Sequence, residues 1–377
     1  MLDWKDRLTF KLESESSGAR AGTIHTPRGT IETPIFMPVG TLGTVKTQSV
    51  DELRRAGAQI ILGNTYHLYL RPGTDVLDAF GGLHRFMGWD APILTDSGGY
   101  QFFSLSKYAK FTEDGVKFSS HHDGGKHFFS PESCIQAQAS IGSDIMMQLD
   151  QCPALPATER TLDDAIRRST NWAKRCLASA KEIAPGALFA IGQGGTDVGR
   201  RIAHIEALAA DDYHGIALGG LAVGETPNEM YDTVEAVTPS MPKDRPRYLM
   251  GVGRPADILE GIARGIDMFD CVMPTRNARN GQVFTRDGKM NMRNARFKRD
   301  EAPIDAQCSC MACTHHSRAY IHHLLRNHEV LGLRLTTTHN LTYYLDLVRG
   351  ARAAIVADEF DSYRSACHSA WETGEKS

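Results

Sequence analysis

The sequence predicts an α/β protein whose main body is a (β/α)₈ TIM barrel, with an N-terminal β-meander before it and a further subdomain after it. Eight short apolar runs rich in strand-forming residues recur along the chain, and helix-like segments separate most of them. Strands that alternate with helices indicate βαβ units and a parallel sheet, and eight such strands suggest a closed barrel. The 377 residues leave room for a barrel of about 250 residues and an appendage. A doubly wound open sheet is the alternative that this pattern leaves open.

The first elements along the chain are expected to form the meander. Thr9–Ser16 and Ala19–Thr26 alternate partly between polar and apolar residues, and glycines punctuate them. The eight runs that follow are the expected barrel strands. They are Pro34–Val39, Gln59–Leu62, Pro92–Thr95, Ile145–Leu149, Leu188–Ile191, Gly215–Leu218, Arg247–Met250 and Met268–Met273.

Capping signals indicate the helices between these strands. Ser49 precedes one helical segment, and Ser130 precedes another that has Pro131 at its first position and an acidic first turn. The remaining expected helices are amphipathic or begin with proline, and they are Leu162–Glu182, Pro227–Val234, Pro255–Ile262, Thr314–Leu331 and Leu341–Ile355.

Composition narrows the class of protein. Hydrophobic residues make up 41% of the chain and charged residues 23%, which excludes a disordered, collagenous or coiled-coil protein. The N-terminus has no apolar signal region, and no apolar stretch approaches the length that spans a bilayer. Most of the eight cysteines are isolated, which is typical of a reducing compartment. We therefore expect a cytoplasmic protein with no membrane partner.

Charge is unevenly distributed along the chain. The formal net charge of −3 by itself argues against a nucleic acid partner. Residues 276–299, however, contain eight basic residues and a single acid, so this segment carries a net charge of +7. It directly follows the eighth expected strand and must lie near the open end of the barrel. A phosphate-rich substrate is the interpretation that we favour over a merely solvated face.

Acidic residues end several of the expected strands. Asp96 follows the third run, Asp150 follows the fourth and Asp270 lies in the eighth, while Gln193 follows the fifth. The active site of a TIM barrel lies at the carboxyl ends of its strands. Several carboxylates on one rim fit acid/base and nucleophilic chemistry at a sugar carbon. The alternative is that these aspartates cap helices or pair with arginines.

A cysteine cluster predicts a metal site. Cys308, Cys310 and Cys313 have C-x-C-x-x-C spacing, and three thiolates with one histidine make a closed tetrahedral zinc site of the structural kind. The alternative is free thiols in a loop. Spacing does not choose the fourth ligand, for which the candidates are His315, His316, His322, His323, His328 and His339. We thus divide the chain into the meander and barrel strands (1–275), a basic and zinc-binding subdomain (276–345), and a C-terminal helix that completes the barrel (346–377).

Four motifs together carry a family resemblance. They are Leu94–Gln101 (LTDSGGYQ), Leu218–Glu225 (LGGLAVGE), Gly265–Asn277 (GIDMFDCVMPTRN), and Cys308–Cys313 (CSCMAC) with Thr338–Asn340 (THN). In these stretches the chain resembles the bacterial queuine tRNA-ribosyltransferases, also called tRNA-guanine transglycosylases. The motifs occur in the family's order, and the similarity extends from Phe10 to about Arg352.

The resemblance implies a zinc-containing (β/α)₈ barrel enzyme, a pentosyltransferase of queuosine biosynthesis. Such an enzyme exchanges the wobble guanine of GUN anticodons, in the tRNAs for aspartate, asparagine, histidine and tyrosine, for 7-aminomethyl-7-deazaguanine. It does so through a covalent tRNA–aspartyl intermediate. The expected partners are therefore tRNA, guanine and the aminomethyl base, and the resemblance also suggests a homodimer.

The resemblance also implies site residues. Asp270 would be the nucleophile at the ribose C1′ and Asp96 the general acid/base. The substrate-binding residues would be Asp96, Ser97, Gly98, Gly99, Tyr100, Asp150, Cys152, Gln193, Gly219, Gly220, Leu221, Val223 and Met250. The RNA-binding residues would be Gly251, Val252, Gly253, Arg254, Pro255, Ala256, Asp257, Thr275, Arg276, Asn277, Ala278 and Arg279. Zinc would be held by Cys308, Cys310, Cys313 and His339.

Within this resemblance, three positions are informative. Ala278 stands where many relatives have glycine, and alanine would strain the chain there if that position needs a positive φ. Val223 and Cys152 match bacterial members, which supports the aminomethyl base as substrate.

Two other functions are compatible with a barrel of this kind, and each predicts a different set of residues. A non-catalytic RNA-binding subunit would lack the catalytic aspartates, yet Asp96 and Asp270 are present. A metal-dependent barrel hydrolase would have His-x-His at the end of the first strand, where this chain has Pro38–Thr41.

Overall fold

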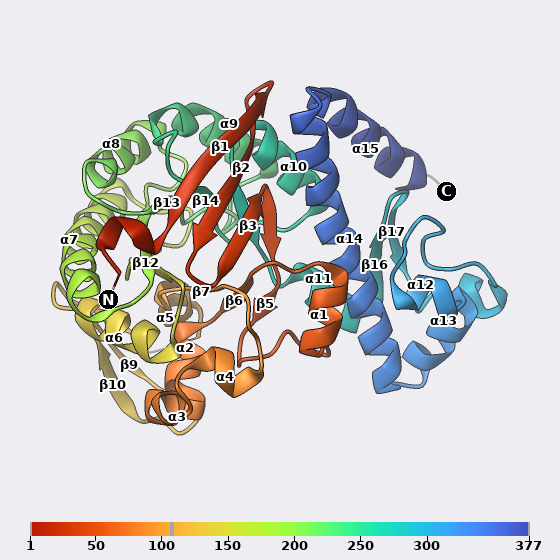
Figure 1. Cartoon of the computed structure of the whole chain (residues 1–377), viewed down its shortest axis with the longest axis horizontal. Helices are drawn as coiled ribbons and strands as arrows, with labels where there is room; N and C mark the ends of the chain where they lie inside the picture. The colour runs from red at the N-terminus through yellow and green to blue at the C-terminus, as the bar shows by residue number, and fades with distance from the viewer. Residues whose placement is uncertain (1, 106–108, 376–377) are drawn as a thin grey trace.

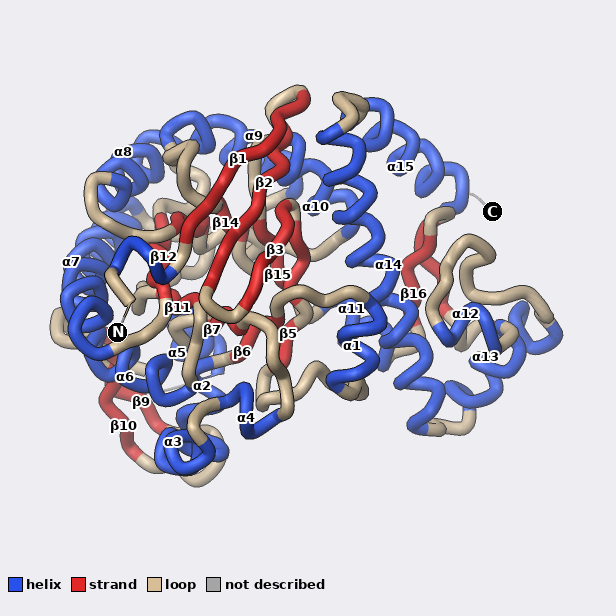
Figure 2. The backbone as a smooth tube through the Cα atoms, in the orientation of Figure 1, coloured by secondary structure: helices blue, strands red, loops and turns tan. Residues whose placement is uncertain are grey.

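A closed parallel barrel forms the centre of the molecule, as the computed structural model, which describes residues 2–105 and 109–375, shows in Figures 1 and 2. In order around the sheet, the strands are β4 (Ile35–Met37), β15 (Met268–Asp270), β14 (Arg247–Leu249), β13 (Gly215–Leu218), β12 (Ala187–Gly192), β11 (Ile145–Met147), β7 (Ile93–Thr95), β6 (Ile61–Gly63) and β5 (Val39–Gly40). β4 and β5 are consecutive pieces of one stretch, so the two ends of the sheet meet and the barrel has eight strand positions. The predicted barrel is confirmed, and each of the eight apolar runs contains barrel strand.

Burial explains why these runs could be recognised. Apart from Asp270 at the rim, every residue of the nine strand segments is buried, because helices cover the outside and side chains fill the inside. The predicted strand boundaries differ from the observed ones by up to three residues, and the largest difference is in the run Met268–Met273, which forms strand only as far as Asp270. Met273 already opens α11 (Met273–Arg279), with Pro274 in its first turn.

Helices surround the barrel, and several begin at the predicted caps. Ser49 and Ser130 accept hydrogen bonds from the first turns of α1 (Val50–Ala56) and α6 (Pro131–Ile141). Other barrel helices are α7 (Glu159–Ile183), α8 (Val198–Ala209), α9 (Pro227–Val237) and α10 (Pro255–Ala263). Shorter helices in the connections are α2 (Thr65–Leu68), α3 (Thr74–Phe80), α4 (Leu83–Met87) and α5 (Gly99–Leu105).

Two small antiparallel sheets flank the barrel. The predicted meander is confirmed as β1 (Thr9–Ser16) and β2 (Ala19–Thr26), and β3 (Gly29–Thr33) joins them. The second sheet, β8 (Lys110–Phe111), β9 (Val116–Ser119) and β10 (Lys126–Phe129), follows α5 and was not predicted. Its strands are short and four of their ten residues are lysine or histidine, so they give no apolar run.

The C-terminal region lies beside the barrel (Figure 1). It contains the hairpin β16 (Gln282–Thr285) and β17 (Gly288–Asn291), then α12 (Met311–His315), α13 (Arg318–Arg326), α14 (Val330–Val356) and α15 (Phe360–Glu375). The helical stretch predicted at Thr314–Leu331 is therefore broken into separate helices. α14 packs against α1, α10 and β4 and so occupies the last helix position of the barrel. The three-part division of the chain stays a prediction.

Within the ranges that the structure describes, none of the helices has the length and apolar character needed to cross a membrane.

A buried ion pair joins β2 to the amino end of β15. Arg20 Nε lies 3.4 Å from Asp267 Oδ1, and both side chains are almost completely buried. Asp267 also accepts a hydrogen bond from the backbone N–H of Arg247. The pair fixes the N-terminal sheet over the end of the barrel that is opposite the carboxyl ends of the strands.

We predict that Asp267→Ala lowers the free energy of unfolding by about 3–5 kcal/mol, because it leaves the Arg20 guanidinium buried without its partner. Urea unfolding followed by circular dichroism measures this change. Asp51→Ala is the matched control: it breaks an exposed pair with Arg54 and should cost less than about 1 kcal/mol. Equal losses in the two variants would contradict the prediction.

Candidate active site

The carboxyl ends of the barrel strands bring the three predicted aspartates to one rim. Asp96 directly follows β7, Asp150 lies beyond β11, and Asp270 ends β15. The negative charge of Asp270 contributes to raising the pKa of Asp96, so the two carboxyl groups lie within electrostatic reach of each other.

The two oxygens of the Asp270 carboxylate have different surroundings. Oδ1 accepts hydrogen bonds from the Tyr248 hydroxyl (2.6 Å) and from the backbone N–H of Gly251 (2.8 Å). Burial raises the pKa of Asp270, while these two donors favour the ionised form. Because both donors bind the same oxygen, the carboxylate is held in one orientation and Oδ2 is the oxygen left to meet a reacting atom.

Asp96 is held by the connection that follows β6. Its Oδ2 accepts from Asn64 Nδ2 (2.5 Å) and its Oδ1 from the backbone N–H of Thr65 (2.9 Å). Burial is the main reason that the pKa of Asp96 is raised to about 7. A carboxyl group with this pKa exchanges a proton readily near neutral pH, which is what a general acid/base requires.

Asp150 forms a buried polar cluster with Ser97 and Gln193. Its Oδ1 accepts from the Ser97 hydroxyl (3.0 Å) and its Oδ2 from Gln193 Nε2 (2.6 Å). Burial raises the pKa of Asp150 to about 6, so the group is mostly ionised at neutral pH. Gln193 Oε1 is buried without a hydrogen-bond partner among the described residues. An unsatisfied amide next to a carboxylate indicates a site that is completed by a polar ligand.

Glycine is required at two positions around this cluster. A Cβ on Gly99 would lie 2.4 Å from Asp150 Oδ1, and a Cβ on Gly220 would lie 2.5 Å from Gln193 Oε1. Gly220 also has a φ of 64°, which residues that carry a side chain rarely adopt. These predicted residues therefore leave space for the polar groups.

The other predicted substrate-binding residues lie around the same strand ends. Tyr100 is exposed in the first turn of α5, and Met250 follows β14. Cys152 is buried, and its sulfur would lie 3.8 Å from a Cβ on Gly220. The Glu225 carboxylate accepts from the backbone N–H groups of Ala222 and Val223. The remaining members of the predicted set, Gly98, Gly219 and Leu221, occupy the turns that leave β7 and β13.

Four residues that support the site were not predicted. Arg201 is buried in α8 and donates to the carbonyl oxygens of Gly192, Gly195 and Gly219, so it ties the ends of β12 and β13 together.

His204 Nδ1 accepts from the backbone N–H of Gln193. Burial lowers the pKa of His204 to about 4, which keeps the ring neutral for this bond. The other two are Tyr248 and Asn64, whose contacts with the aspartates are described above.

The predicted RNA-binding residues form two segments beside Asp270. Gly251–Asp257 runs from the end of β14 into α10, and Thr275–Arg279 lies in α11. Ala278 lies near the end of α11, has no positive φ and is buried, so the strain that alanine would cause at a positive φ does not arise.

The basic residues of segment 276–299 do not all face solvent freely. Arg286 pairs with Asp305 at 3.2 Å, and Arg293 donates to the carbonyl oxygen of Leu325. Arg276 and Lys289 are exposed.

A buried group of three cysteines and one histidine can hold a metal ion. The donor atoms of Cys308, Cys310, Cys313 and His339 all lie within 4.8 Å of one another. His339 Nε2 donates to the carbonyl oxygen of Phe284 (2.8 Å), which leaves Nδ1 facing the sulfurs, 3.2 Å from Cys313 Sγ. Three thiols and an oriented imidazole fit a tetrahedral metal ion.

The fold and the site together define a class: a TIM-barrel enzyme whose carboxylates suit nucleophilic and acid/base chemistry, with a Cys₃His group outside the barrel. Comparison with known proteins identifies the member of this class. The family model for queuine tRNA-ribosyltransferase matches residues 14–373, and the chain belongs to this family of pentosyltransferases.

Curated relatives agree with this assignment. Proteins named queuine tRNA-ribosyltransferase from Acidithiobacillus ferrooxidans, Herpetosiphon aurantiacus and Bacillus subtilis are 53%, 52% and 51% identical to the chain. The alignments cover 94%, 95% and 97% of this chain and 95%, 91% and 96% of the relatives.

We predict that the protein binds about one metal ion per chain and that Cys313→Ala reduces the metal content to near zero while lowering the thermal unfolding midpoint. Metal analysis by mass spectrometry and calorimetry measure the two effects. Cys367→Ala, which changes a cysteine in α15 outside the group, is the matched control and should keep the metal. A folded wild-type chain without metal would refute the structural role.

Proposed function

We propose that this protein exchanges the wobble guanine of tRNAs with GUN anticodons, those for aspartate, asparagine, histidine and tyrosine, for 7-aminomethyl-7-deazaguanine. The observation that supports this most is the pairing of two unlike carboxyl groups on one rim. Asp270 has one oxygen fixed by two donors, and Asp96 has a pKa of about 7. Replacing a base on a sugar with retention needs a nucleophile and a separate acid/base.

In the first displacement, Oδ2 of Asp270 attacks the ribose C1′ as the C1′–N9 bond breaks. Asp96 gives its proton to the departing guanine and becomes a carboxylate. The product is an ester between C1′ and Asp270 together with free guanine. The Tyr248 and Gly251 donors fix the direction of attack.

In the second displacement, the incoming base attacks C1′ from the side that guanine left. Asp96 takes the proton from N9 of this base, and the C1′–Oδ2 bond breaks to return Asp270 as a carboxylate. Two inversions give retention, and the proton is restored to Asp96. No proton is gained or lost over the cycle.

The polar cluster around Asp150 is suited to a guanine-like base. Its carboxylate accepts from the N–H groups of the Watson–Crick edge. Gln193 Nε2 uses one hydrogen on Asp150, and its second hydrogen, with the backbone N–H of Gly220, serves the carbonyl oxygen of the base. Tyr100 and Met250 would enclose the ring from its two faces. Val223 and Cys152 support the aminomethyl base as the one inserted.

Phosphate contacts must hold the anticodon loop while its base leaves the stack. We assign this task to Gly251–Asp257 and Thr275–Arg279. We also propose that the metal of the Cys₃His group is zinc, which would stabilise the fold without reaching the reacting atoms. The homodimer stays a prediction.

We predict that Asp270→Ala reduces incorporation of labelled guanine into tRNA by at least about a thousandfold, because the nucleophile is lost. Asp270→Asn should also fail to give a tRNA–protein adduct that survives a denaturing gel. Asp232→Ala, a substitution of an exposed aspartate on α9, should keep full activity. Substantial exchange by a folded Asp270→Ala protein would overturn the nucleophile assignment.

We predict that Tyr248→Phe lowers kcat by about 10- to 100-fold, the effect of removing a hydrogen bond to a charged group, while KM for tRNA changes little. Tyr248 favours the ionised form of Asp270, so its loss raises the pKa of that carboxyl. Because Asp270 must be ionised to attack, the acid limb of the pH–rate profile should move to higher pH. An unchanged acid limb would mean that Tyr248 does not act through Asp270.

A further inference from the structure

Arg201 is a buried cation whose partners are backbone groups. It lies near the start of α8, and its side chain is completely buried. All four of its side-chain hydrogen bonds end on backbone carbonyl oxygens, and no carboxylate of the described residues pairs with it. A buried charge without a counter-ion is costly, so the contacts that hold it there must be favourable.

The charge of Arg201 persists at neutral pH. Burial lowers the pKa of its guanidinium to about 10, and the nearby Cys152 and Glu225 oppose this decrease only in part. A group with this pKa is almost entirely protonated near pH 7. A full positive charge therefore lies beside the carboxyl ends of β12 and β13.

The glycine-rich turn after β12 folds around this side chain. Arg201 Nε and Nη2 donate to the carbonyl oxygen of Gly195 (2.9 and 2.6 Å). Nη1 donates to the carbonyl oxygens of Gly192 (3.1 Å) and Gly219 (3.0 Å). A Cβ on Gly194 would lie 3.0 Å from the backbone nitrogen of Arg201, so the turn and the helix approach each other too closely for a larger residue.

Arg201 orients the peptide group that joins Gly219 to Gly220. In a trans peptide the C=O and N–H bonds point in opposite directions. The carbonyl oxygen of Gly219 faces Arg201, so the N–H of Gly220 points away from the cation. Burial raises the pKa of Cys152 to about 12, and the Gly220 N–H, a donor to its sulfur, is among the groups that oppose this rise. The Gly220 N–H therefore points to the side of the turn where the proposed base site lies.

The peptide group between Gly192 and Gln193 is held at both ends by α8. Its carbonyl oxygen accepts from Arg201, and its N–H donates to His204 Nδ1 (2.9 Å). The two side chains are three positions apart, on one face of the helix. This fixes the backbone of Gln193, whose amide donates to Asp150 (2.6 Å).

The Gly220 N–H is the donor that the proposed function assigns to the carbonyl oxygen of the base. The other end of its peptide group is hydrogen-bonded to a cation, and hydrogen bonds in a chain polarise one another. This N–H is therefore a stronger donor than an ordinary backbone amide. When the glycosidic bond breaks, negative charge spreads from N9 to the carbonyl oxygen of the base, and a donor that is fixed in advance stabilises this charge.

We propose that Arg201 is a positioning residue for base recognition: it aims the Gly220 N–H at the carbonyl oxygen of the base and strengthens that hydrogen bond. The proposal rests on the proposed function, since it takes a guanine-like base to lie against Gly220. The buried charge acts on the base through one peptide group, and the cation itself stays outside the base site.

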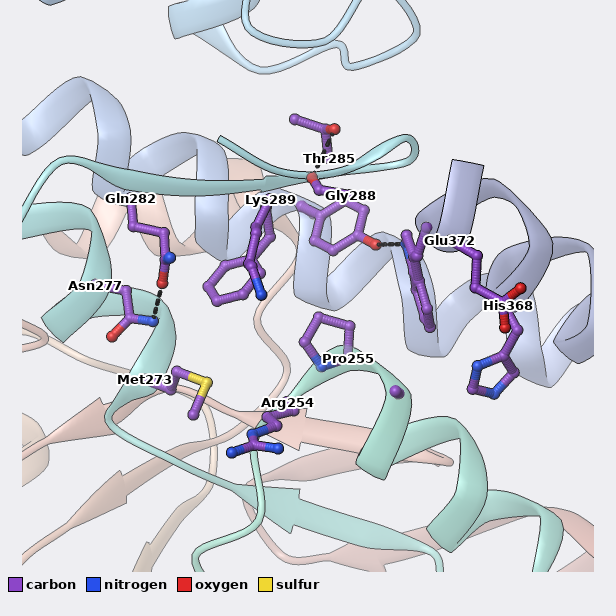
Figure 3. A pocket seen from close by; sticks show the side chains of 14 residues that line it. Arg254, Pro255, Met273, Asn277, Gln282, Thr285, Gly288, Lys289, His368 and Glu372 are labelled. Atoms are coloured by element: carbon purple, nitrogen blue, oxygen red, sulfur yellow. Dashed lines mark hydrogen bonds between the residues drawn. The ribbon is translucent and has the colours of Figure 1, made fainter. Parts of the chain in front are cut away.

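The surfaces proposed to hold the RNA lie elsewhere. Figure 3 shows a cavity of about 490 Å³ that is lined by Arg254, Pro255 and Asn277, which belong to the proposed RNA-binding segments. None of the described residues that line this cavity is hydrogen-bonded to Arg201. A substitution of Arg201 should therefore weaken binding of the base and leave the phosphate contacts with RNA intact.

Steady-state kinetics tests the effect on the base. Arg201→Met removes the charge and the donors and should raise KM for 7-aminomethyl-7-deazaguanine about tenfold, the effect of weakening a charge-assisted hydrogen bond. Arg201→Lys keeps the charge and should restore part of this loss. Binding of unmodified tRNA transcript should change less than about threefold, because phosphate contacts supply most of its affinity.

Arg200→Met is the matched control. It removes the neighbouring arginine of α8, which pairs with Asp163 on the surface, and both KM for the base and tRNA binding should stay at the wild-type values. An unchanged KM for the base in a folded Arg201 variant, or equal weakening of base and tRNA, would overturn the proposal.

Infrared difference spectroscopy tests the hydrogen bond itself, with the aminomethyl base isotopically labelled at its carbonyl carbon. A stronger donor weakens the C=O bond, so the band of the base bound to wild-type protein should lie at lower wavenumber than that of the free base in water. It should move to higher wavenumber in Arg201→Lys and further in Arg201→Met.

A wild-type band at or above the position for the free base would overturn the proposal, whether or not the variants fold. A band that does not move in a folded variant would do so as well, because a merely structural arginine does not act on the carbonyl group of the base. A wild-type protein that exchanges no base would instead refute the proposed function, so the two failures are distinguishable.

Discussion

Keeping three carboxyl groups together on one rim of the barrel, where burial disfavours their charged forms, is the constraint on which the site depends. Each group needs hydrogen-bond donors to remain usable, and the donors come from different strand connections. Tyr248 on β14 donates a hydrogen bond to Asp270, and Asn64 beyond β6 donates one to Asp96. Such donors meet only when the barrel is closed. The free energy that closes the barrel therefore also sets the proton affinities of the carboxyl groups on which the proposed chemistry depends.

Two neighbouring residues of α14 link the C-terminal region to the helix that follows Asp270. His339 faces the three cysteines, while Asn340 accepts from the backbone N–H of Phe284 and donates to the carbonyl oxygens of Pro274 and Gln282. Pro274 belongs to α11, which directly follows Asp270. A metal that fixes α14 against the hairpin would thus also hold α11. The contribution of the metal to function would then be positional.

The barrel strands and most of the Cys₃His group could be predicted, because strong local sequence patterns mark them. Parallel barrel strands are buried on both faces, so apolar runs identified them, and cysteine spacing identified three of the four residues of the Cys₃His group. His339 lies 26 residues beyond Cys313, and no local pattern distinguishes it from the other histidines; only the family resemblance singled it out. Arg201 and Tyr248 were missed for a similar reason. Each acts on residues that tertiary structure brings to it, and as single residues in ordinary apolar or helical surroundings they give no signal in the sequence.

The path of α14 has a consequence for how the chain acquires its structure. This helix occupies the last helix position of the barrel and packs on β1 and β2, elements from the opposite end of the chain. The strands between are therefore synthesised and paired before their final cover exists. Contacts between such distant segments form slowly, and uncovered apolar surface favours association with other chains in the meantime. The surfaces of β1, β2 and β4 that α14 covers therefore stay exposed until this helix has emerged from the ribosome. Docking of this late helix then completes the barrel.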